Sequence, residues 1–284
     1  MPTRTLQHLI PAVATTDGGG VKLQRSLGQN QSSRLDPFLM LDEFSSATAD
    51  DYIAGFPAHP HRGFETVTYM LEGNMRHQDH LGNQGELTSG GAQWMTAGRG
   101  IIHSEMPQQD SGRMRGFQLW INLPAREKMQ PPNYQDIAPT AIPTVELANG
   151  GSVRVLAGTA ELDGNHVAGP IQGLSTAPLF LDVRLPAHGY FQLHLNPDHH
   201  AFVYPYEAGL EVGPAHELRT VPPQTAGLLS DGDMVEIRAS AATAFLLLAG
   251  CPLHEPIVQY GPFVMNTRAE IEQAIADYNN GQLV

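Results

Sequence analysis

Cysteine is almost absent from this chain, which has one, Cys251, among 284 residues. One cysteine cannot form an intrachain disulfide, and a chain of this size without disulfides is typical of a reducing compartment. Long hydrophobic runs are missing too, since the apolar run at 244–249 is far shorter than the roughly 20 residues that cross a bilayer. The N-terminal segment 1–11 lacks the uninterrupted apolar stretch of a secretion signal. We therefore expect a cytoplasmic protein that does not bind membranes.

Basic residues are the second shortage. Lysine and arginine number 16 against 29 aspartate and glutamate residues, so the net charge at pH 7 is -13 and the isoelectric point is about 5.3. Proteins that bind nucleic acids draw much of their affinity from lysine and arginine side chains on the phosphate backbone. We therefore expect no direct binding to nucleic acid.

Glycine and proline, in contrast, are abundant, with 29 and 22 residues, while charged residues make up only 16% of the chain. Segments with apolar and polar residues in alternation are separated by clusters of turn-forming residues, as at Gly82-Asn83, Ser89-Gly90-Gly91 and Asp231-Gly232-Asp233. The alternation is clearest at 66–71, 117–121 and 190–195. Alternation with period two between turns predicts an all-β protein, built as an antiparallel sandwich or barrel.

The length of the chain favours two domains, because 284 residues exceed what one hydrophobic core usually fills. Residues 126–143 include four prolines, which remove hydrogen-bond donors and therefore exclude central strands. We place the domain boundary in this region and expect an N-terminal domain at 1–135 and a C-terminal domain at 136–284. A loose repeat of strand and turn spacing favours two related halves.

One helix is expected near the C-terminus. Thr267 and Glu270 have the spacing of a capping box, in which each side chain satisfies a backbone N–H of the first turn. The apolar residues that follow have helical spacing, and Gly281 is the expected end of the helix. These apolar residues are Ile271, Ala274, Ile275 and Tyr278. We expect this apolar stripe to pack on a sheet.

Two short segments among the 13 histidines predict a metal site. His59 and His61 are two residues apart, and so are His103 and Glu105. Side chains at i and i+2 of a strand share one face, so two facing strands would present three imidazoles and one carboxylate. Such a set suits a divalent first-row metal, namely iron, copper, manganese, nickel or zinc. The alternative is that either pair belongs to a hydrogen-bonded polar cluster at the end of a strand.

Other polar residues near these segments point less clearly to a site. We interpret His77 and His80 as a solvated rim, with a place just behind the metal ligands as the alternative. Glu65 follows His61 by four residues, and we assign it a structural role rather than a place among the ligands. The second half of the chain has no His-x-His or His-x-Glu segment, and we expect no metal there.

Two long motifs resemble the pirin signature within the cupin superfamily. They are His59–Tyr69 and Gln93–Met106, and the stretches Leu35–Phe44 and Gly261–Thr267 resemble the N-terminal and C-terminal parts of the same family. The resemblance implies a bicupin, in which two jelly-roll β-barrels pack face to face and only the N-terminal one holds metal. It also implies that the metal is most often Fe(II). The ligands that it implies are His59, His61, His103 and Glu105.

The resemblance implies two kinds of function. Some bacterial pirins are similar to quercetin 2,3-dioxygenases, which cleave a flavonol with dioxygen and release carbon monoxide. In that reaction Glu105 is the expected catalytic residue, because a carboxylate beside the metal can accept the proton of the flavonol hydroxyl. The alternative is a non-enzymatic, iron-binding and redox-responsive regulator that binds a partner protein. We favour the enzyme.

Overall fold

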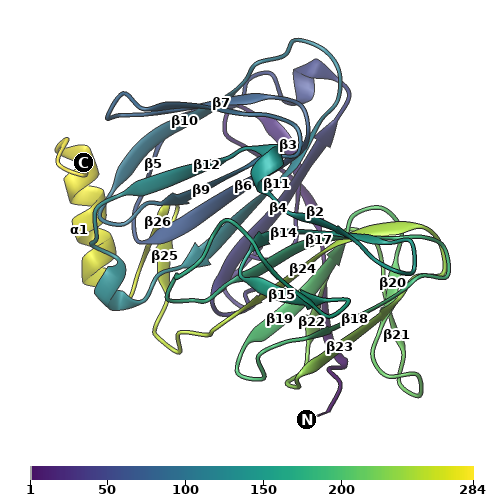
Figure 1. The fold of residues 1–284 in the computed structure, drawn as a ribbon. Helices are drawn as coiled ribbons and strands as arrows, with labels where there is room; N and C mark the ends of the chain where they lie inside the picture. The colour runs from purple at the N-terminus through teal and green to yellow at the C-terminus, as the bar shows by residue number, and fades with distance from the viewer. Residues whose placement is uncertain (1) are drawn as a thin grey trace. The chain divides into compact units, whose positions relative to one another are not determined.

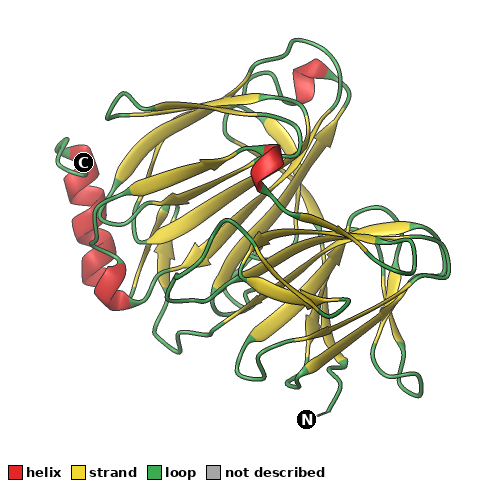
Figure 2. Ribbon diagram, in the orientation of Figure 1, coloured by secondary structure: helices red, strands yellow, loops and turns green. Residues whose placement is uncertain are grey.

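The computed structural model describes residues 2–284 and consists mainly of β-strands, as Figure 2 shows. They form two compact units, each with a seven-stranded and a four-stranded antiparallel sheet. The prediction of an all-β protein with two barrel domains and a C-terminal helix is confirmed, whereas the face-to-face packing of the barrels stays a prediction. No helix among residues 2–284 is long and apolar enough to span a membrane.

The unit that carries the candidate metal ligands comprises 14–25, 38–139 and 253–284. Its seven-stranded sheet has the order β12 (Asn133–Ile137), β9 (Ala92–Thr96), β6 (Phe64–Glu72), β11 (Met114–Asn122), β4 (Phe38–Ser46), β3 (Val21–Arg25) and β2 (Val13–Asp17). Its four-stranded sheet has the order β5 (Phe56–His61), β10 (Ile101–Pro107), β7 (Met75–Asp79) and β8 (Gln84–Leu87). Short elements complete the unit: the hairpin β25 (Val258–Tyr260) and β26 (Phe263–Met265), the helix α1 (Arg268–Asn279), and the 3-10 turns η1 (Ala49–Asp51) and η2 (Ala125–Glu127). A third 3-10 turn, η3 (Pro139–Ala141), spans the change of unit between 139 and 140.

The other unit comprises residues up to Val13, 26–37 and 140–252. Its seven-stranded sheet has the order β1 (Leu6–Pro11), β22 (Thr225–Leu229), β19 (His200–Pro205), β24 (Thr243–Gly250), β17 (Leu179–Leu185), β14 (Ser152–Ala157) and β13 (Thr144–Glu146). Its four-stranded sheet has the order β18 (Tyr190–His194), β23 (Met234–Arg238), β20 (Leu210–Val212) and β21 (Arg219–Val221). The hairpin β15 (Thr159–Leu162) and β16 (Asn165–Ala168) completes it. An apolar cluster that includes Phe191, Leu193, Val235 and Ile237 fills this unit.

The two ends of the chain belong to different units from their neighbours in sequence. Strand β1 pairs with β22 in the unit that contains 140–252. Helix α1 packs on the β25–β26 hairpin in the unit that contains the three histidines (Figure 1). Each unit is therefore built from three segments of the chain, whereas a single boundary between 135 and 136 would give each unit one segment. One change of unit, between 139 and 140, lies in the expected proline-rich region. The division into domains 1–135 and 136–284 stays a prediction.

Strand β6 shows how the unit with the candidate metal ligands separates its inner and outer faces. Thr68 reaches across to Glu105 on the four-stranded sheet, so its side chain lies inside the barrel. Because strand side chains alternate, Glu65 and Val67 lie on the opposite face. There Thr96 donates a hydrogen bond of 2.7 Å to Oε1 of Glu65. The expected structural role of Glu65 agrees with this position.

The helix α1 begins as the capping box predicts. Glu270 N–H donates to the Thr267 hydroxyl at 3.2 Å, and Thr267 N–H donates to the Glu270 carboxylate at 2.8 Å. The apolar stripe is narrower than expected, because Ile271 and Ala274 are buried whereas Tyr278 is 42% exposed. The helix ends at Asn279, two residues before Gly281.

The carboxyl group of Glu65 makes stability depend on pH. Burial raises the pKa of Glu65 from 4.5 to about 7, so the folded state binds more protons than the unfolded state between these pH values. Stability is therefore lost as pH rises through this window, by up to about 1.4 kcal/mol per pH unit. We expect Glu65→Gln to unfold at higher urea concentration than wild type at pH 8 and at a similar concentration at pH 4.5. Glu72→Gln, an exposed residue of the same strand, is the control and should follow wild type at both pH values.

Loss of the N-cap should weaken α1. We expect Thr267→Ala to destabilise the docked helix by about 1 kcal/mol, because one backbone N–H loses its acceptor. The measurement is amide hydrogen exchange of α1, which should be faster in this variant. Thr267→Ser keeps the hydroxyl and should exchange like wild type; equal exchange in the alanine variant would contradict the prediction.

Candidate metal centre

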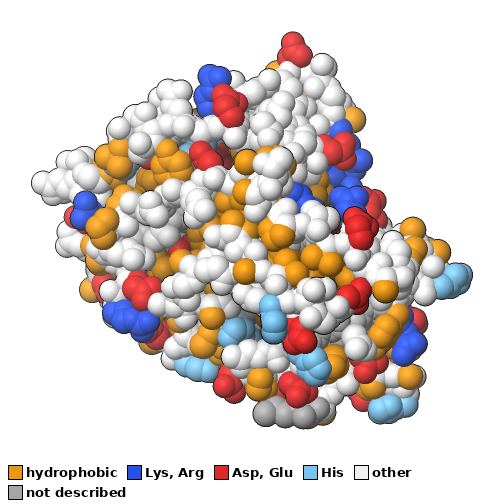
Figure 3. Space-filling view, in the orientation of Figure 1, with side chains coloured by type: hydrophobic (Ala, Val, Ile, Leu, Met, Phe, Trp, Pro, Cys, Tyr) orange, Lys and Arg blue, Asp and Glu red, His pale blue; other side chains and the backbone are white. Residues whose placement is uncertain are grey.

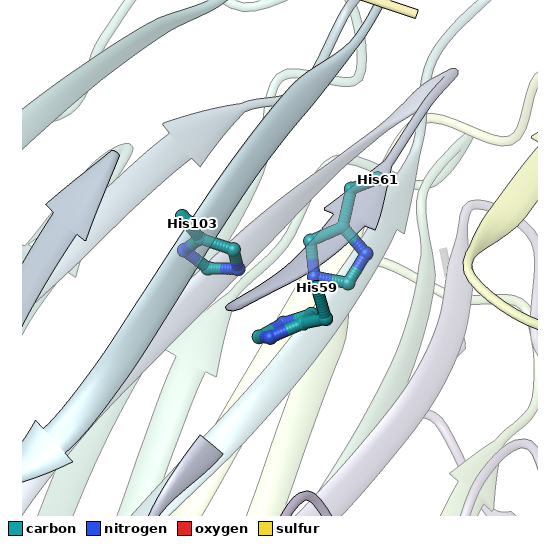
Figure 4. A group of neighbouring side chains, drawn as sticks. All are labelled: His59, His61 and His103. Atoms are coloured by element: carbon teal, nitrogen blue, oxygen red, sulfur yellow. The ribbon is translucent and has the colours of Figure 1, made fainter. Parts of the chain in front are cut away.

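Three histidine side chains meet on one face of two neighbouring strands. His59 and His61 lie two residues apart on β5, and His103 on β10 is the direct partner of His59 in the antiparallel ladder. Their ligand atoms all lie within 4.8 Å of one another. Figure 4 shows the three rings turned toward a common space. The structure therefore brings together three of the four ligands expected from the sequence.

Local sequence explains why β5 can present two histidines in this way. Strand β5 is an edge strand that pairs only with β10 in its sheet. Pro57 and Pro60 are tolerated there because an edge strand leaves some of its N–H positions without a partner strand. The strand alternation between Pro60 and its neighbours leaves both imidazoles on the same side.

The ring nitrogens are arranged as metal ligands require. Nδ1 of His59 lies 2.8 Å from the carbonyl oxygen of Pro57, and donation of its proton to that oxygen leaves the lone pair on Nε2. Within residues 2–284, Nδ1 of His61 and both ring nitrogens of His103 are buried without a hydrogen-bond partner. Buried polar atoms are rarely left unpaired, so these donor atoms fit a metal ion.

Burial also keeps these rings neutral. Desolvation, followed by the proximity of His59, lowers the pKa of His61 well below its usual value of 6.5. Desolvation also lowers the pKa of His103 well below 6.5, with smaller contributions from His61, His59 and His77. A neutral imidazole has a lone pair for a metal, so no proton has to be displaced at neutral pH.

Glu105, the fourth expected ligand, lies near the triad but apart from it. It is 4% exposed on β10, and the ladder with β5 shifts register between His103 and Glu105. Among the described residues, Glu105 does not join the set whose ligand atoms all lie within 4.8 Å of one another. Its Oε1 lies 2.7 Å from the hydroxyl of Thr68, which lies 2.7 Å from Oε1 of Gln118. Its role as a ligand and as the catalytic residue stays a prediction.

His77 belongs to the same interior, and the interpretation of it as a solvated rim residue is wrong. It is 2% exposed, pairs with Glu105 in the β7–β10 ladder, and has its ring centroid 5.1 Å from that of His103. Neither of its ring nitrogens has a hydrogen-bond partner among residues 2–284. Its position two residues after the buried Met75 was the available signal, since such residues share a strand face. His80, in contrast, is exposed as expected.

Two aromatic rings form a wall beside the triad. The ring of His61 lies 5.1 Å from Phe64 and 5.3 Å from Trp120, centroid to centroid. Phe64 and Trp120 lie 4.3 Å apart, and Trp120 is partly exposed whereas Phe64 is fully buried. Phe64 is therefore a core residue. Trp120 was recognised in the sequence only as part of an alternating strand.

Charged side chains on the surface are mixed. On the face drawn in Figure 3, lysine and arginine side chains lie singly or beside acidic ones rather than as an extended basic surface. Among the exposed ion pairs, Arg76 of β7 and Glu86 of β8 lie 2.8 Å apart. This face therefore offers little to a polyanionic ligand.

Comparison with known proteins agrees with this arrangement. The family model described as Pirin matches residues 20–121, and that described as Pirin C-terminal cupin domain matches residues 180–284. A provisionally named quercetin 2,3-dioxygenase from Pseudomonas aeruginosa is 52% identical over 268 residues, which are 94% of each chain. A pirin-like protein from Caulobacter vibrioides is 48% identical over 283 residues, covering 99% of this chain and 100% of the relative. The crystal structure of a quercetin 2,3-dioxygenase from Acinetobacter baumannii matches with a TM-score of 0.89 and 33% identity, over 99% of this chain and 98% of the other. The chain belongs to the pirin family.

Proposed function

We propose that the protein is a metal-dependent dioxygenase that cleaves a flavonol such as quercetin with dioxygen and releases carbon monoxide. The observation that carries this proposal is the set of three histidines whose ligand atoms lie within 4.8 Å of one another. The names of the Pseudomonas and Acinetobacter relatives support a flavonol as the substrate class. We propose the cytoplasm as the compartment, because the chain has one cysteine and therefore no intrachain disulfide.

The residues that would hold the metal are His59, His61 and His103, with Glu105 as the proposed fourth ligand. Imidazole and carboxylate ligands together suit Fe(II), which we propose as the native metal, and also copper, manganese, nickel or zinc. A bound ion of this kind would stabilise the deprotonated flavonol 3-hydroxyl as a Lewis acid and supply the redox chemistry toward dioxygen.

Glu105 would move the proton of the substrate. Its carboxylate is almost fully buried, and the hydrogen bond between its Oε1 and the Thr68 hydroxyl orients it inside the barrel. The carboxylate would shift between its role as ligand and that of a base, and would accept the proton of the flavonol 3-hydroxyl. A positioned carboxylate that acts as a general base accelerates a reaction by roughly 10²–10⁴-fold.

Trp120 would orient the substrate. Its ring is partly exposed and packs on Phe64 and His61, so one face of the site is aromatic and held in place by buried neighbours. A flat, electron-rich flavonol can stack on such a wall, since offset aromatic stacking stabilises a complex by about 0.5–1.5 kcal/mol. Stacking would also exclude water from one side of the bound ring.

The metal ligands can be tested by removing one of them. We expect His61→Ala to lose bound metal and to release no carbon monoxide from quercetin, because two imidazoles remain where three converge. Metal content after anaerobic reconstitution and carbon monoxide release measure the two effects. His8→Ala, an exposed histidine of the other unit, is the control and should match wild type. Retained turnover in His61→Ala would refute the site.

The role of Glu105 in proton transfer can be tested by comparing variants at equal metal content, because Glu105 is also the proposed fourth ligand. We expect Glu105→Gln to lower kcat on quercetin by about 10²–10⁴-fold, because an amide cannot accept the proton. Glu86→Gln, which changes an exposed carboxylate of β8, should leave kcat unchanged. If the wild-type protein binds metal but cleaves no member of a flavonol panel, the dioxygenase proposal fails and the non-enzymatic regulator becomes the better account.

A further inference from the structure

We propose that the C-terminal segment 262–283 is a positioning element of the metal centre, joined to the histidine strands through Arg62, so that metal binding and docking of α1 stabilise each other. This inference rests on the metal site of the proposed function. The residues concerned are not themselves proposed metal ligands. The segment is also distant in sequence from β5, since Arg62 and Asp277 are 215 positions apart.

Arg62 directly follows His61 and is 3% exposed. All three of its guanidinium nitrogens donate hydrogen bonds. Nη1 donates to Asp277 Oδ2 of α1 at 2.6 Å, Nη2 donates to the carbonyl oxygen of Leu283 at 3.3 Å, and Nε donates to the carbonyl oxygen of Arg99. One buried side chain therefore connects the end of β5, the loop before β10 and the C-terminus.

The contact with Arg99 matters for the distance between the ligands. Arg99 lies in the loop that leads into β10, the strand of His103, whereas Arg62 continues β5, the strand of His61. The backbone repeats this connection, because Gly63 N–H donates to the carbonyl oxygen of Gly98 at 2.8 Å. The Arg62 guanidinium thus holds together the ends of both histidine strands on the side where α1 docks.

The backbone of the C-terminal segment lies directly on this junction. Arg62 N–H donates to the carbonyl oxygen of Pro262 at 3.3 Å, and Val264 N–H donates to the carbonyl oxygen of Arg62 at 3.0 Å. A Cβ atom on Gly63 would lie 2.0 Å from the carbonyl oxygen of Val264, so only glycine allows this approach. The buried Lys128 ammonium donates to the carbonyl oxygens of both Gly63 and Val264, at 2.7 and 3.1 Å.

Apolar packing extends the contact to the strand of His103. Ile102, the residue before His103, packs against a buried cluster from the C-terminal segment. The cluster consists of Phe263, Met265, Ile271, Ala274 and Leu283. A Cβ atom on Gly100 would lie 2.2 Å from the carbonyl oxygen of Leu283, so the last residues of the chain rest on the loop before β10. Both histidine strands therefore carry the C-terminal segment on their outer side.

This geometry predicts reciprocal stabilisation. If the docked segment holds His61 and His103 in the arrangement that binds metal, detachment of α1 weakens metal binding. Linkage then requires that a bound metal stabilises the docked segment by the same free energy. Asp277 and Arg62 are accordingly positioning residues, which act on the metal through the histidines and do not touch it.

The test uses the full-length protein with Co(II) as the probe. We expect Co(II) to slow amide hydrogen exchange in 268–284 of wild type, and Asp277→Asn to lose most of this effect. In the same variant we expect a chelator to remove Co(II) at least about tenfold faster, because loss of a residue that supports metal ligands usually weakens metal binding by that factor or more. The visible absorption spectrum of the bound Co(II) should also change. Glu272→Gln makes the same charge change on α1 at an exposed residue that pairs with Arg268, and should behave as wild type.

A second variant tests the other contact of Arg62 with the C-terminal segment. Truncation after Gly281 removes the Leu283 carbonyl and its buried side chain but keeps α1 and Asp277, and we expect a smaller increase of the Co(II) dissociation rate in the same direction. If Co(II) binds to the wild-type protein but does not change the hydrogen exchange rate of α1, the inference is overturned while the proposed metal site still holds. Wild-type Co(II) dissociation and spectrum in Asp277→Asn would overturn the inference as well. Failure of wild type to bind Co(II) or Fe(II) would instead overturn the proposed function, and the inference with it.

Discussion

The antiparallel register between β5 and β10 is the constraint on which the candidate metal centre depends. His103 lies opposite His59, and His61 lies two residues further along β5, so three imidazoles share one face. A slip of one residue would turn one strand's histidines to the other face. The contacts of Arg62 with the loop before β10 and with α1 hold the same two strands in place from the outside.

The two units have four-stranded sheets of corresponding strand order but carry different side chains at the inward positions. Strands β18 and β23 have the same place in their sheet as β5 and β10 in theirs. Their buried side chains are apolar, with Leu193 opposite Val235 and Phe191 opposite Ile237. Where one barrel gathers imidazoles, the other is filled with hydrocarbon. The fold alone therefore does not specify the chemistry, which depends on the side chains at a few inward positions.

The interior of the barrel with the three histidines buries several polar groups. His61, His77 and His103 are buried with unpaired ring nitrogens, and Thr68 and Glu105 are buried beside them. Removing such groups from water without partners reduces stability, by about 1–3 kcal/mol for each unsatisfied group. A bound metal would satisfy some of these groups. Buried polar side chains without protein partners, which a purely structural core avoids, are expected at a functional site.

Short-range patterns in the sequence were sufficient to predict the strands, the capping box of α1 and the pairing of His59 with His61 on one face, because strand alternation and helix capping depend on neighbours. They did not identify His77 as an interior residue, because it stands in a run of polar residues, 76–80, in which alternation of apolar and polar types is not visible. The exchange of chain ends between the units and the ion pair of Arg62 with Asp277 came only from the tertiary structure. Which strand edge receives a distant segment is decided by packing and hydrogen bonds between residues far apart in the chain, and local periodicity carries no information about them.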